Sequence, residues 1–328
     1  MIISRTPFRI SFFGGGTDYP AWYNDNKGAT LATTINKYCY ITCRFLPPFF
    51  EHKYRIVYSL IERVKEISEI AHPAVKACLK FTKIEDGVEI HHDGDLPARS
   101  GLGSSSSFTV GLLHTLYALK GTMLTKRQLA LDAIHVEQQL IKESVGSQDQ
   151  VLAAFGGFNR IDFGGDHQIL IKHMAIGKEK IEQLHSHLML FFTGLSRTAS
   201  DIACEQIKNI PNRKKELLQM YQMVNEAENI LNGKNIKEFG KLLHESWKFK
   251  KSLSDKISMP RIDDIYNTAL NAGALGGKLL GAGGGGFILF FVEPGKQAKV
   301  KEKLKRLLKV PFNFEDLGSQ IIFYQPNS

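Results

Sequence analysis

The most informative stretch of this sequence is Leu96-Pro97-Ala98-Arg99-Ser100-Gly101-Leu102-Gly103-Ser104-Ser105-Ser106-Ser107. It predicts a glycine-rich loop that leads into a helix, because Phe108, Leu112 and Leu116 follow at helical spacing. The hydroxyl of Ser104 is expected to cap that helix. A helix start combines unpaired N–H groups with the positive end of the helix dipole, and glycines let an anion approach the backbone. The segment therefore predicts a phosphate-binding site.

Two common phosphate-binding motifs do not match this loop. A Walker A loop has Lys followed by Ser or Thr after its last glycine, and no such Lys follows Gly103 in this chain. A dinucleotide fingerprint requires a third glycine where this chain has Ser106. Gly281, Gly283 and Gly286 satisfy the dinucleotide spacing, but the residues after them predict a strand instead of a helix. A serine-rich helix start without a ligand stays open as the alternative.

The composition predicts a globular chain with one large domain or two closely packed ones. Of its 328 residues 43% are hydrophobic, and the net charge is +9. This surplus suits small phosphorylated substrates, acidic membranes or nucleic acid. The densest basic run, residues 296–309, has apolar residues at helical spacing and predicts a surface helix more than a nucleic-acid patch. Because no apolar run could span a membrane and no signal peptide is evident, we expect a cytoplasmic protein.

The four cysteines show no spacing typical of zinc sites. They are expected to be buried free thiols in a reducing compartment. They are Cys39, Cys43, Cys78 and Cys204.

The rest of the chain mixes strand and helix patterns. Alternating apolar residues predict strands over residues 28–45, 56–60 and 88–92. Residues 62–80 predict a helix that is interrupted at Pro73. Further helices are expected over residues 212–231, 236–253 and 262–272. The mixture indicates an α+β fold.

A polar turn follows the first expected strand. Residues 10–13 predict the end of that strand, and Gly14-Gly15-Gly16 and Thr17-Asp18 come directly after it. Arg9 precedes it. Because an isolated charge beside a buried strand is costly, we expect Arg9 and Asp18 to face one polar cleft. A hairpin turn with solvated flanks is the alternative.

Two further acidic residues, Glu137 and Asp149, occur in the middle of the chain. Residues 126–144 predict a helix whose apolar stripe includes position 137, yet that position is Glu137. A carboxylate on an inward face needs a cation or strong hydrogen bonds. Asp149 follows in the polar turn 146–150. A charge at the edge of the stripe stays open as the alternative.

Three segments together resemble the motifs of the GHMP kinases, a family of small-molecule kinases that includes galactokinase and mevalonate kinase. They are residues 5–20, 97–106 and 276–287, and they occur in the order of the family. The resemblance implies an α+β fold of two domains, the first similar to ribosomal protein S5 domain 2 and the second ferredoxin-like. The active site would lie between them. We place the two domains at residues 1–175 and 176–328.

The resemblance also implies a phosphotransferase that uses ATP and Mg²⁺. Asp149 would accept the proton of the acceptor hydroxyl, with Arg9 beside it, and Ser105 and Glu137 would bind Mg²⁺, with Ser104 as the alternative hydroxyl. The ATP site would comprise Pro97, Arg99, Ser100, Gly101, Leu102, Gly103, Ser104, Ser105 and Ser106. The substrate site would comprise Gly15, Gly16, Thr17, Asp18, Lys37, Arg197, Gly283 and Gly284. Arg197 follows an expected strand and precedes an expected helix, and we infer that it binds the distal phosphate of the substrate. Arg44 is a further candidate for this contact.

The three glycines before Thr17-Asp18 distinguish this chain from galactokinase, which has Glu-His there, and resemble the heptose 7-phosphate kinase branch of the family. This implies phosphorylation of the anomeric C1 hydroxyl of D-glycero-D-manno-heptose 7-phosphate to the 1,7-bisphosphate, for nucleotide-activated heptose. No nucleic-acid or membrane partner is implied. The alternatives are a fucokinase-like enzyme acting on an unphosphorylated sugar and a non-catalytic sugar or nucleotide sensor.

Overall fold

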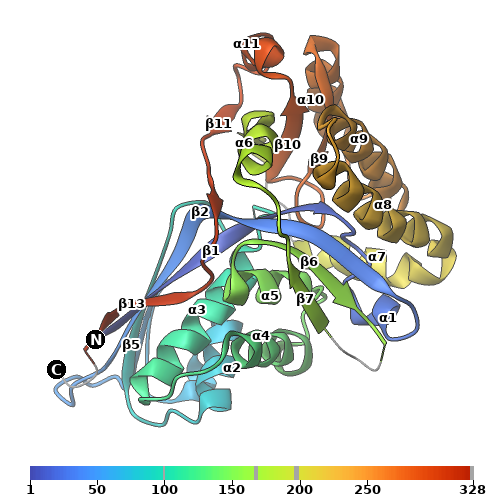
Figure 1. Ribbon diagram of the computed structural model, residues 1–328. Coiled ribbons are helices and arrows are strands. Elements are labelled where there is room, and N and C mark those ends of the chain that lie inside the picture. The colour runs from blue at the N-terminus through green and yellow to red at the C-terminus, as the bar shows by residue number, and fades with distance from the viewer. Residues whose placement is uncertain (99, 166–168, 196–198, 326–328) are drawn as a thin grey trace.

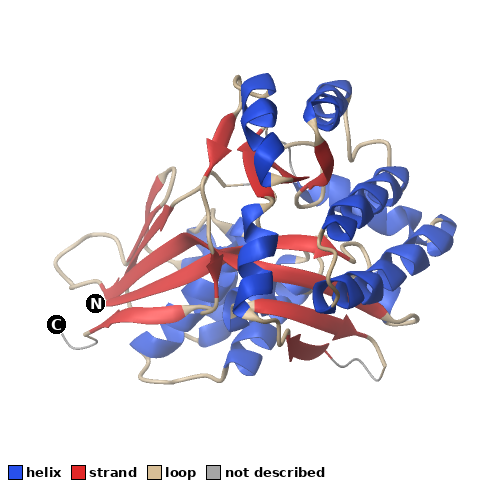
Figure 2. Cartoon of the chain, turned by 45° about the horizontal axis from the view of Figure 1, so that its top comes forward, coloured by secondary structure: helices blue, strands red, loops and turns tan. Residues whose placement is uncertain are grey.

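A computed structural model describes residues 1–98, 100–165, 169–195 and 199–325. Within these residues the chain forms a large sheet and a small sheet, each with helices packed against it (Figure 1). Both helices and strands occur in each part of the described chain, as Figure 2 shows by colour. The expected α+β class is therefore confirmed.

The large sheet is built around the long strand β2 (Gly28–Phe45). One edge of β2 pairs with β1 (Ile2–Phe13), and its other edge pairs in turn with β6, β12 and β5, all antiparallel. The remaining strands of this sheet are β3 (Tyr54–Val57), β4 (Ile61–Val64), β5 (Val88–Gly94), β6 (Phe158–Phe163), β7 (Ile169–His173), β12 (Phe314–Glu315) and β13 (Gln320–Tyr324).

Strand β1 has a sharp division between its two faces. Phe8, Ile10 and Phe12 enter the main hydrophobic core, as β-forming residues with period-two alternation do. The residues between them, Arg9 and Ser11, are also buried but polar. Strand alternation thus directs two polar side chains to the opposite face, where the site described below lies.

Helices cover the face of the large sheet on the side seen below it in Figure 1. They are α2 (Pro73–Thr82), α3 (Ser104–Leu119), α4 (Lys126–His135) and α5 (Gln148–Phe155), with the π-helical turn η2 (Val136–Ile141) after α4 and the short α1 (Pro20–Tyr23) elsewhere. The side chain of Thr125 caps α4 by accepting a hydrogen bond from Gln128 N at 3.1 Å.

The expected helix over residues 62–80 is wrong in its first half. Residues 61–64 form strand β4, which pairs with β3, and the 3₁₀ turn η1 (Ile67–Glu69) follows. Helix α2 begins at Pro73, because proline fits the first turn of a helix, where its missing N–H costs nothing. Pro73 starts the helix instead of interrupting it.

The small sheet has the order β11-β8-β10-β9 in the described residues. Its elements are α6 (Lys178–Ser186), β8 (Leu188–Phe192), α7 (Ala199–Asn209), η3 (Ile210–Asn212), α8 (Lys214–Asn232), α9 (Lys237–Ser252), α10 (Pro260–Ala272), β9 (Ala274–Leu279), β10 (Phe287–Val292), η4 (Pro294–Lys296), α11 (Gln297–Lys303) and β11 (Leu308–Val310). Helix α9 packs closely on β9, since a Cβ on Gly276 would lie 2.0 Å from Gly240 O. The three helices expected in this half are confirmed as α8, α9 and α10.

The basic run 296–309 forms a shorter helix than expected. Helix α11 ends at Lys303, and Leu308 begins strand β11 with 66% of its surface exposed. Val300 and Leu304 are buried, so the apolar stripe holds only for the helical part. Cys39, Cys43 and Cys78 are buried free thiols as expected, and Cys204 is half-buried.

The end of the chain returns to the first sheet. Strand β12 pairs with β2, and β13 pairs with β1, which places the two ends of the chain side by side in Figure 1. The division into domains at residues 1–175 and 176–328 stays a prediction, and residues 314–324 of the second range complete the large sheet around β2.

Candidate active site

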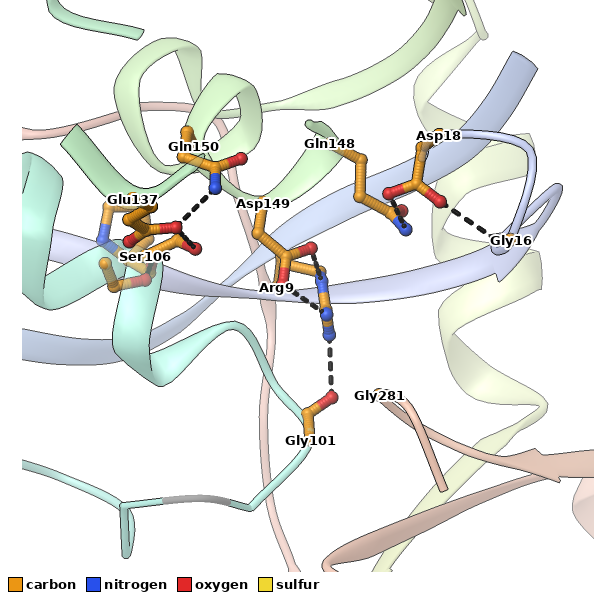
Figure 3. A network of polar contacts seen from close by, with 12 residues as sticks. Arg9, Gly16, Asp18, Gly101, Ser106, Glu137, Gln148, Asp149, Gln150 and Gly281 are labelled. Carbon is orange, nitrogen blue, oxygen red and sulfur yellow. Dashed lines mark hydrogen bonds and ion pairs between the residues drawn. The ribbon is translucent and has the colours of Figure 1, made fainter. Parts of the chain in front are cut away.

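The site is organised around an ion pair between Arg9 on β1 and Asp149 in the first turn of α5 (Figure 3). Arg9 Nε and Nη2 donate to the two carboxylate oxygens of Asp149, both at 2.7 Å. The third nitrogen, Nη1, donates to Gly101 O at 2.7 Å. Arg9 is 5% exposed and cannot turn away without losing these bonds. The Arg9 guanidinium therefore holds strand β1, the glycine loop at Gly101 and the carboxylate of Asp149 in one fixed geometry.

The two glycine-rich loops are in direct contact. A Cβ on Gly281 would lie 2.4 Å from Gly101 Cα, and one on Gly286 would lie 2.1 Å from Ser100 O. Phe287 N donates to Ser100 O at 3.1 Å. Side chains at these glycines would separate the loops, so the close approach explains their composition.

Helix α3 begins at Ser104, but Ser104 does not cap it. Gly103 holds the N-cap position with φ 76°, a left-handed conformation that favours glycine, and no side chain caps the helix. The first N–H groups of α3 are therefore available to an anion. Ser100 and Leu102 are buried, and Arg99 lies outside the described residues.

Glu137 is buried in the π-helical turn η2, a distortion often found at functional sites. Its Oε2 accepts hydrogen bonds from Ser106 Oγ, at 2.9 Å, and from Gln150 Nε2. Its Oε1 has no hydrogen-bond partner among the described residues. Burial raises the pKa of Glu137 to about 7, although the polar groups of Thr109, Ser106 and Gln150 beside it lower the pKa in part. The unpartnered oxygen of a buried carboxyl group is the kind of atom that a cation would satisfy.

The serine beside Glu137 is Ser106, whereas the sequence predicts Ser105 as its partner in metal binding. The Ser105 residue is exposed, one position before the contact. The joint binding of Mg²⁺ by Ser105 and Glu137 stays a prediction, and the hydroxyl that contacts Glu137 directly is that of Ser106.

Asp18 is buried in the turn after β1. Gly16 N and Gln148 Nε2 donate to its two oxygens at 2.9 and 3.0 Å. The carboxylate packs directly on Gly146, since a Cβ there would lie 1.9 Å from Asp18 Oδ2. Burial is the main cause of a raised Asp18 pKa, and the nearby charge of Asp149 adds to it.

Three successive residues of α5 connect these groups. Their contacts are Gln148 to Asp18, Asp149 to Arg9, and Gln150 to Glu137. In Figure 3, Asp149 accordingly lies between Asp18 on one side and Glu137 on the other. The start of α5 is thus the element that brings the predicted carboxylates into one site.

The comparisons with known proteins identify the family. Residues 64–157 match the GHMP kinase N-terminal domain, and residues 227–310 match the GHMP kinase C-terminal domain. The chain belongs to the GHMP kinase family. As a member with sugar-kinase relatives it is a phosphotransferase, and kinases of this family use ATP.

The relatives of this GHMP kinase include several sugar kinases. It is 29% identical to the D-glycero-alpha-D-manno-heptose 7-phosphate kinase of Campylobacter jejuni, over 93% of each chain. It is 23% identical to the galactokinase of Pyrococcus furiosus, over 96% of this chain and 95% of that one. The solved structure of a D-glycero-D-manno-heptose 1-phosphate kinase from Bacteroides thetaiotaomicron matches with a TM-score of 0.78 and 25% identity, over 98% of each chain.

Two buried lysines of this GHMP kinase lie beside the site although no sequence pattern indicated them. Lys250 Nζ on α9 donates to Leu279 O at 3.3 Å and to Gly281 O. Lys278 Nζ on β9 donates to Phe12 O at 2.8 Å, across to the first sheet. Burial lowers the pKa of Lys250 to about 7, with smaller effects of Arg9, Asp18 and Asp149. Position 250 lies on the buried face of α9, the same pattern that pointed to Glu137.

Two predicted substrate residues, Lys37 and Arg44, lie on β2 and make no hydrogen bond to Arg9 or to the carboxylates of the site in the described residues. Arg44 pairs with Glu89 on the neighbouring strand, about 30 Å along β2 from the residue opposite Arg9. Lys37 is half-buried on β2 without a contact to the site in the described residues. The Thr17 hydroxyl donates to Gly14 O in its own turn at 2.8 Å and to Ala29 O on β2 at 3.0 Å. Arg197 lies outside the described residues.

Gly283 and Gly284 shape the third loop. A Cβ on Gly283 would lie 2.8 Å from Ile257 Cα, and Gly284 N donates to Ile257 O at 2.9 Å. Their observed contacts are with the chain itself. A role in substrate binding stays a prediction.

The described residues contain no group of three or more His, Cys, Asp or Glu side chains that could hold a metal ion. Glu137 would need hydroxyl groups, phosphate oxygens or water to complete a Mg²⁺ site, and Mg²⁺ in kinases is commonly bound in this way. No helix in the described part of the chain combines the length and apolar character needed to cross a membrane.

Proposed function

We propose that this sugar kinase transfers the γ-phosphoryl group of ATP to the anomeric C1 hydroxyl of D-glycero-D-manno-heptose 7-phosphate. The observation that carries the proposal is the similarity to a heptose 7-phosphate kinase over 93% of both chains. The buried turn with Gly16 and Asp18 supports it, because the sequence around that turn resembles the same branch. The 1,7-bisphosphate product would supply nucleotide-activated heptose, and the buried free thiols suit a cytoplasmic enzyme.

In this proposal Asp149 accepts the proton of the attacking hydroxyl. Its side chain is 24% exposed, so one edge of the carboxylate is open to a substrate. Arg9 holds both oxygens and fixes the direction in which the carboxylate points. A positioned base and an oriented acceptor are the main protein contributions to phosphoryl transfer.

The uncapped start of α3 and the loop before it would bind the triphosphate. The N–H groups there and the helix dipole favour negative charge. Glu137, with Ser106 beside it and Ser105 or Ser104 on the same turn, would hold Mg²⁺, which its unpartnered buried oxygen fits. When bound, Mg²⁺ would neutralise charge on the phosphates. Asp18 would accept hydrogen bonds from sugar hydroxyls.

The second candidate is a fucokinase-like enzyme that acts on an unphosphorylated sugar. It is favoured by the 26% identity to L-fucokinase/L-fucose-1-P guanylyltransferase of Bacteroides fragilis, over 92% of this chain and 35% of that one. The solved neighbour called a heptose 1-phosphate kinase adds a further substrate to compare. Both alternatives keep the roles of Asp149 and Arg9.

The test is a coupled ADP-release assay with MgATP and a panel of acceptors. The panel comprises mannoheptose 7-phosphate, mannoheptose 1-phosphate, free mannoheptose, fucose, galactose and mannose. We expect turnover of the 7-phosphate at a kcat/KM at least tenfold above every other acceptor. The Asp149→Asn variant, purified in the same way, controls for contaminating kinases. Preference for a free sugar would replace the substrate but keep the kinase mechanism, and no turnover of any sugar would favour a sensor.

A further inference from the structure

We propose that Ser11 and Gln148 form a subsite that binds one sugar hydroxyl other than the one that is phosphorylated. The inference rests on the proposed function, since it assumes a sugar in this site. It assigns a substrate contact to two residues that the motifs do not single out. The ligand chemistry is that of an alcohol group, which can both donate and accept a hydrogen bond.

The first observation is a pair of buried polar atoms without partners. Ser11 Oγ and Gln148 Oε1 make no hydrogen bond in the described residues, and the two residues are 6% and 7% exposed. A buried polar atom that stays unpaired costs free energy, so native proteins rarely keep one without a ligand or water. Two of them in one place indicate a site that a polar ligand completes.

The second observation is that the Ser11 hydroxyl and the Gln148 side-chain amide lie on either side of one position, that of a Cβ on Gly15. A Cβ on Gly15 would lie 3.8 Å from Gln148 Nε2 and 3.9 Å from Ser11 Oγ. Apart from chain neighbours, no other heavy atom of the described residues lies within 4 Å of that position. Gly15 is itself partly exposed, so a ligand atom can reach the space from outside.

The orientation of both side chains is fixed. Ser11 lies on the same face of β1 as Arg9, and both belong to an unbroken part of the β1–β2 register. Gln148 Nε2 donates to Asp18, which leaves Oε1 as the free acceptor of the amide. A hydroxyl in the space could donate to Gln148 Oε1 and accept from Ser11 Oγ. Gln148 also precedes Asp149 directly, so the subsite is adjacent to the proposed base.

The principal test is Ser11→Ala, compared with Ser4→Ala on the same strand. Ser11 has no partner to lose, so its loss should leave the melting temperature unchanged or slightly higher. It should lower kcat/KM for the sugar roughly 10- to 100-fold, with KM for ATP within about twofold. Ser4 is buried and donates to Gly111 O at 2.9 Å, far along β1 from the site. Ser4→Ala should show the reverse: a lower melting temperature and unchanged sugar kinetics.

Gly15→Ala provides an independent variant, because it fills the space without removing a polar atom. Gly15 has ordinary backbone geometry and its Cβ would make only van der Waals contacts, so the variant should fold. We expect KM for the sugar to rise at least tenfold, with KM for ATP unchanged. Singly deoxygenated sugars then identify the hydroxyl, since Ser11→Ala should have no further effect on the analogue that lacks it.

The outcomes separate this inference from the proposed function. If the protein phosphorylates any sugar, the variants are measured with that sugar, whichever it is. Unchanged sugar kinetics in both Ser11→Ala and Gly15→Ala would then overturn the subsite and leave the kinase assignment intact. If no sugar is turned over or bound in a calorimetric titration, the proposed function and the subsite both fail.

Discussion

At the scale of single residues, the Arg9–Asp149 pair gives the sharpest prediction. A general base contributes roughly 100- to 10,000-fold to a rate, so we expect Asp149→Asn to lower kcat by that amount. KM for ATP should change less than threefold, because the nucleotide loop bonds to Arg9 through a main-chain oxygen and makes no hydrogen bond to Asp149 in the described residues. Steady-state kinetics with saturating sugar measure both quantities.

The chain offers a matched control for this substitution. Asp162 on β6 accepts a 2.8 Å bond from Arg160 Nε, and its side chain is 23% exposed, close to the 24% of Asp149. Asp162→Asn should change stability by a similar amount and leave kcat unchanged. An Asp149→Asn enzyme with wild-type turnover would remove Asp149 as the base.

Glu137 predicts how stability depends on pH. Burial raises its pKa from 4.5 to about 7, so the folded protein holds an extra proton between these two values. The stabilisation from this group is complete below about pH 4.5 and is lost as the pH rises through 7. Glu137→Gln, which stays neutral, should therefore gain roughly 2–3 kcal/mol over the wild type at pH 8 and little at pH 4.5.

The measurement is urea unfolding of both proteins at pH 4.5 and pH 8, with a chelator present. The same stability difference at both pH values would contradict the prediction. Without the chelator, added Mg²⁺ should stabilise the wild type at pH 8 but not Glu137→Gln, because a bound cation favours the ionised carboxylate. The stability difference between the two proteins should therefore become smaller.

At the scale of elements, local patterns predicted what lies within one segment. Helices α8, α9 and α10 follow from apolar spacing, and the helix after the glycine loop begins where the loop ends. The hairpin of β3 and β4 was missed because its pairing is not visible in the spacing of residues 61–64. Helical periodicity placed Glu137 inside but did not reveal the π-helical turn that carries it.

The residues of the site were likewise predicted where the sequence carries a local pattern and missed where it does not. The motif residues Arg9, Asp149 and Glu137 are brought together as expected, since each has a local signature. Lys250 was missed although it stands on an apolar helix face, because lysines often extend to the surface from such positions. The hydrogen bond from Ser106 to Glu137 was not predicted, because the side chain that a helix directs inward depends on the residue at which the helix starts.

The contact between the glycine loops predicts a specific sensitivity of Gly281. Its φ is +74°, and a Cβ would lie 2.4 Å from Gly101 Cα. We expect Gly281→Ala to raise KM for ATP at least tenfold, because the nucleotide loop must move away. Gly121→Ala is the control, since Gly121 has φ +70° with nothing within 4 Å of its Cβ position.

The control separates backbone strain from the clash. Both variants should lose about 1–2 kcal/mol of stability from the left-handed conformation alone. Only Gly281→Ala should affect ATP binding, measured by isothermal titration. Equal KM values for ATP in the two variants would show that the loop contact does not position the nucleotide site.

At the scale of the whole molecule, the site depends on contacts between distant parts of the chain. Lys278 on the small sheet donates to Phe12 O on the large sheet, and Tyr19 and Trp22 from the N-terminal turn join the hydrophobic core of the second unit. Met223 and Phe239 in turn join the core of the first. Such long-range pairing leaves no local pattern, so the sequence left open one large domain or two closely packed ones.

The returning C-terminal strand carries the last prediction. Strand β13 covers the outer edge of β1, and Ser319 beside it bonds to Thr6 Oγ1 at 2.8 Å and His114 Nδ1 at 3.0 Å. A chain that ends at residue 311 loses these bonds and exposes the edge of the strand that holds Arg9. We expect its melting temperature to fall by at least about 5 °C and aggregation to increase. A chain that ends at Gln325 keeps β13 and should match the full-length protein in calorimetry and in turnover. If the chain that ends at residue 311 has the melting temperature and the turnover of the full-length protein, the first unit does not need the returning strand.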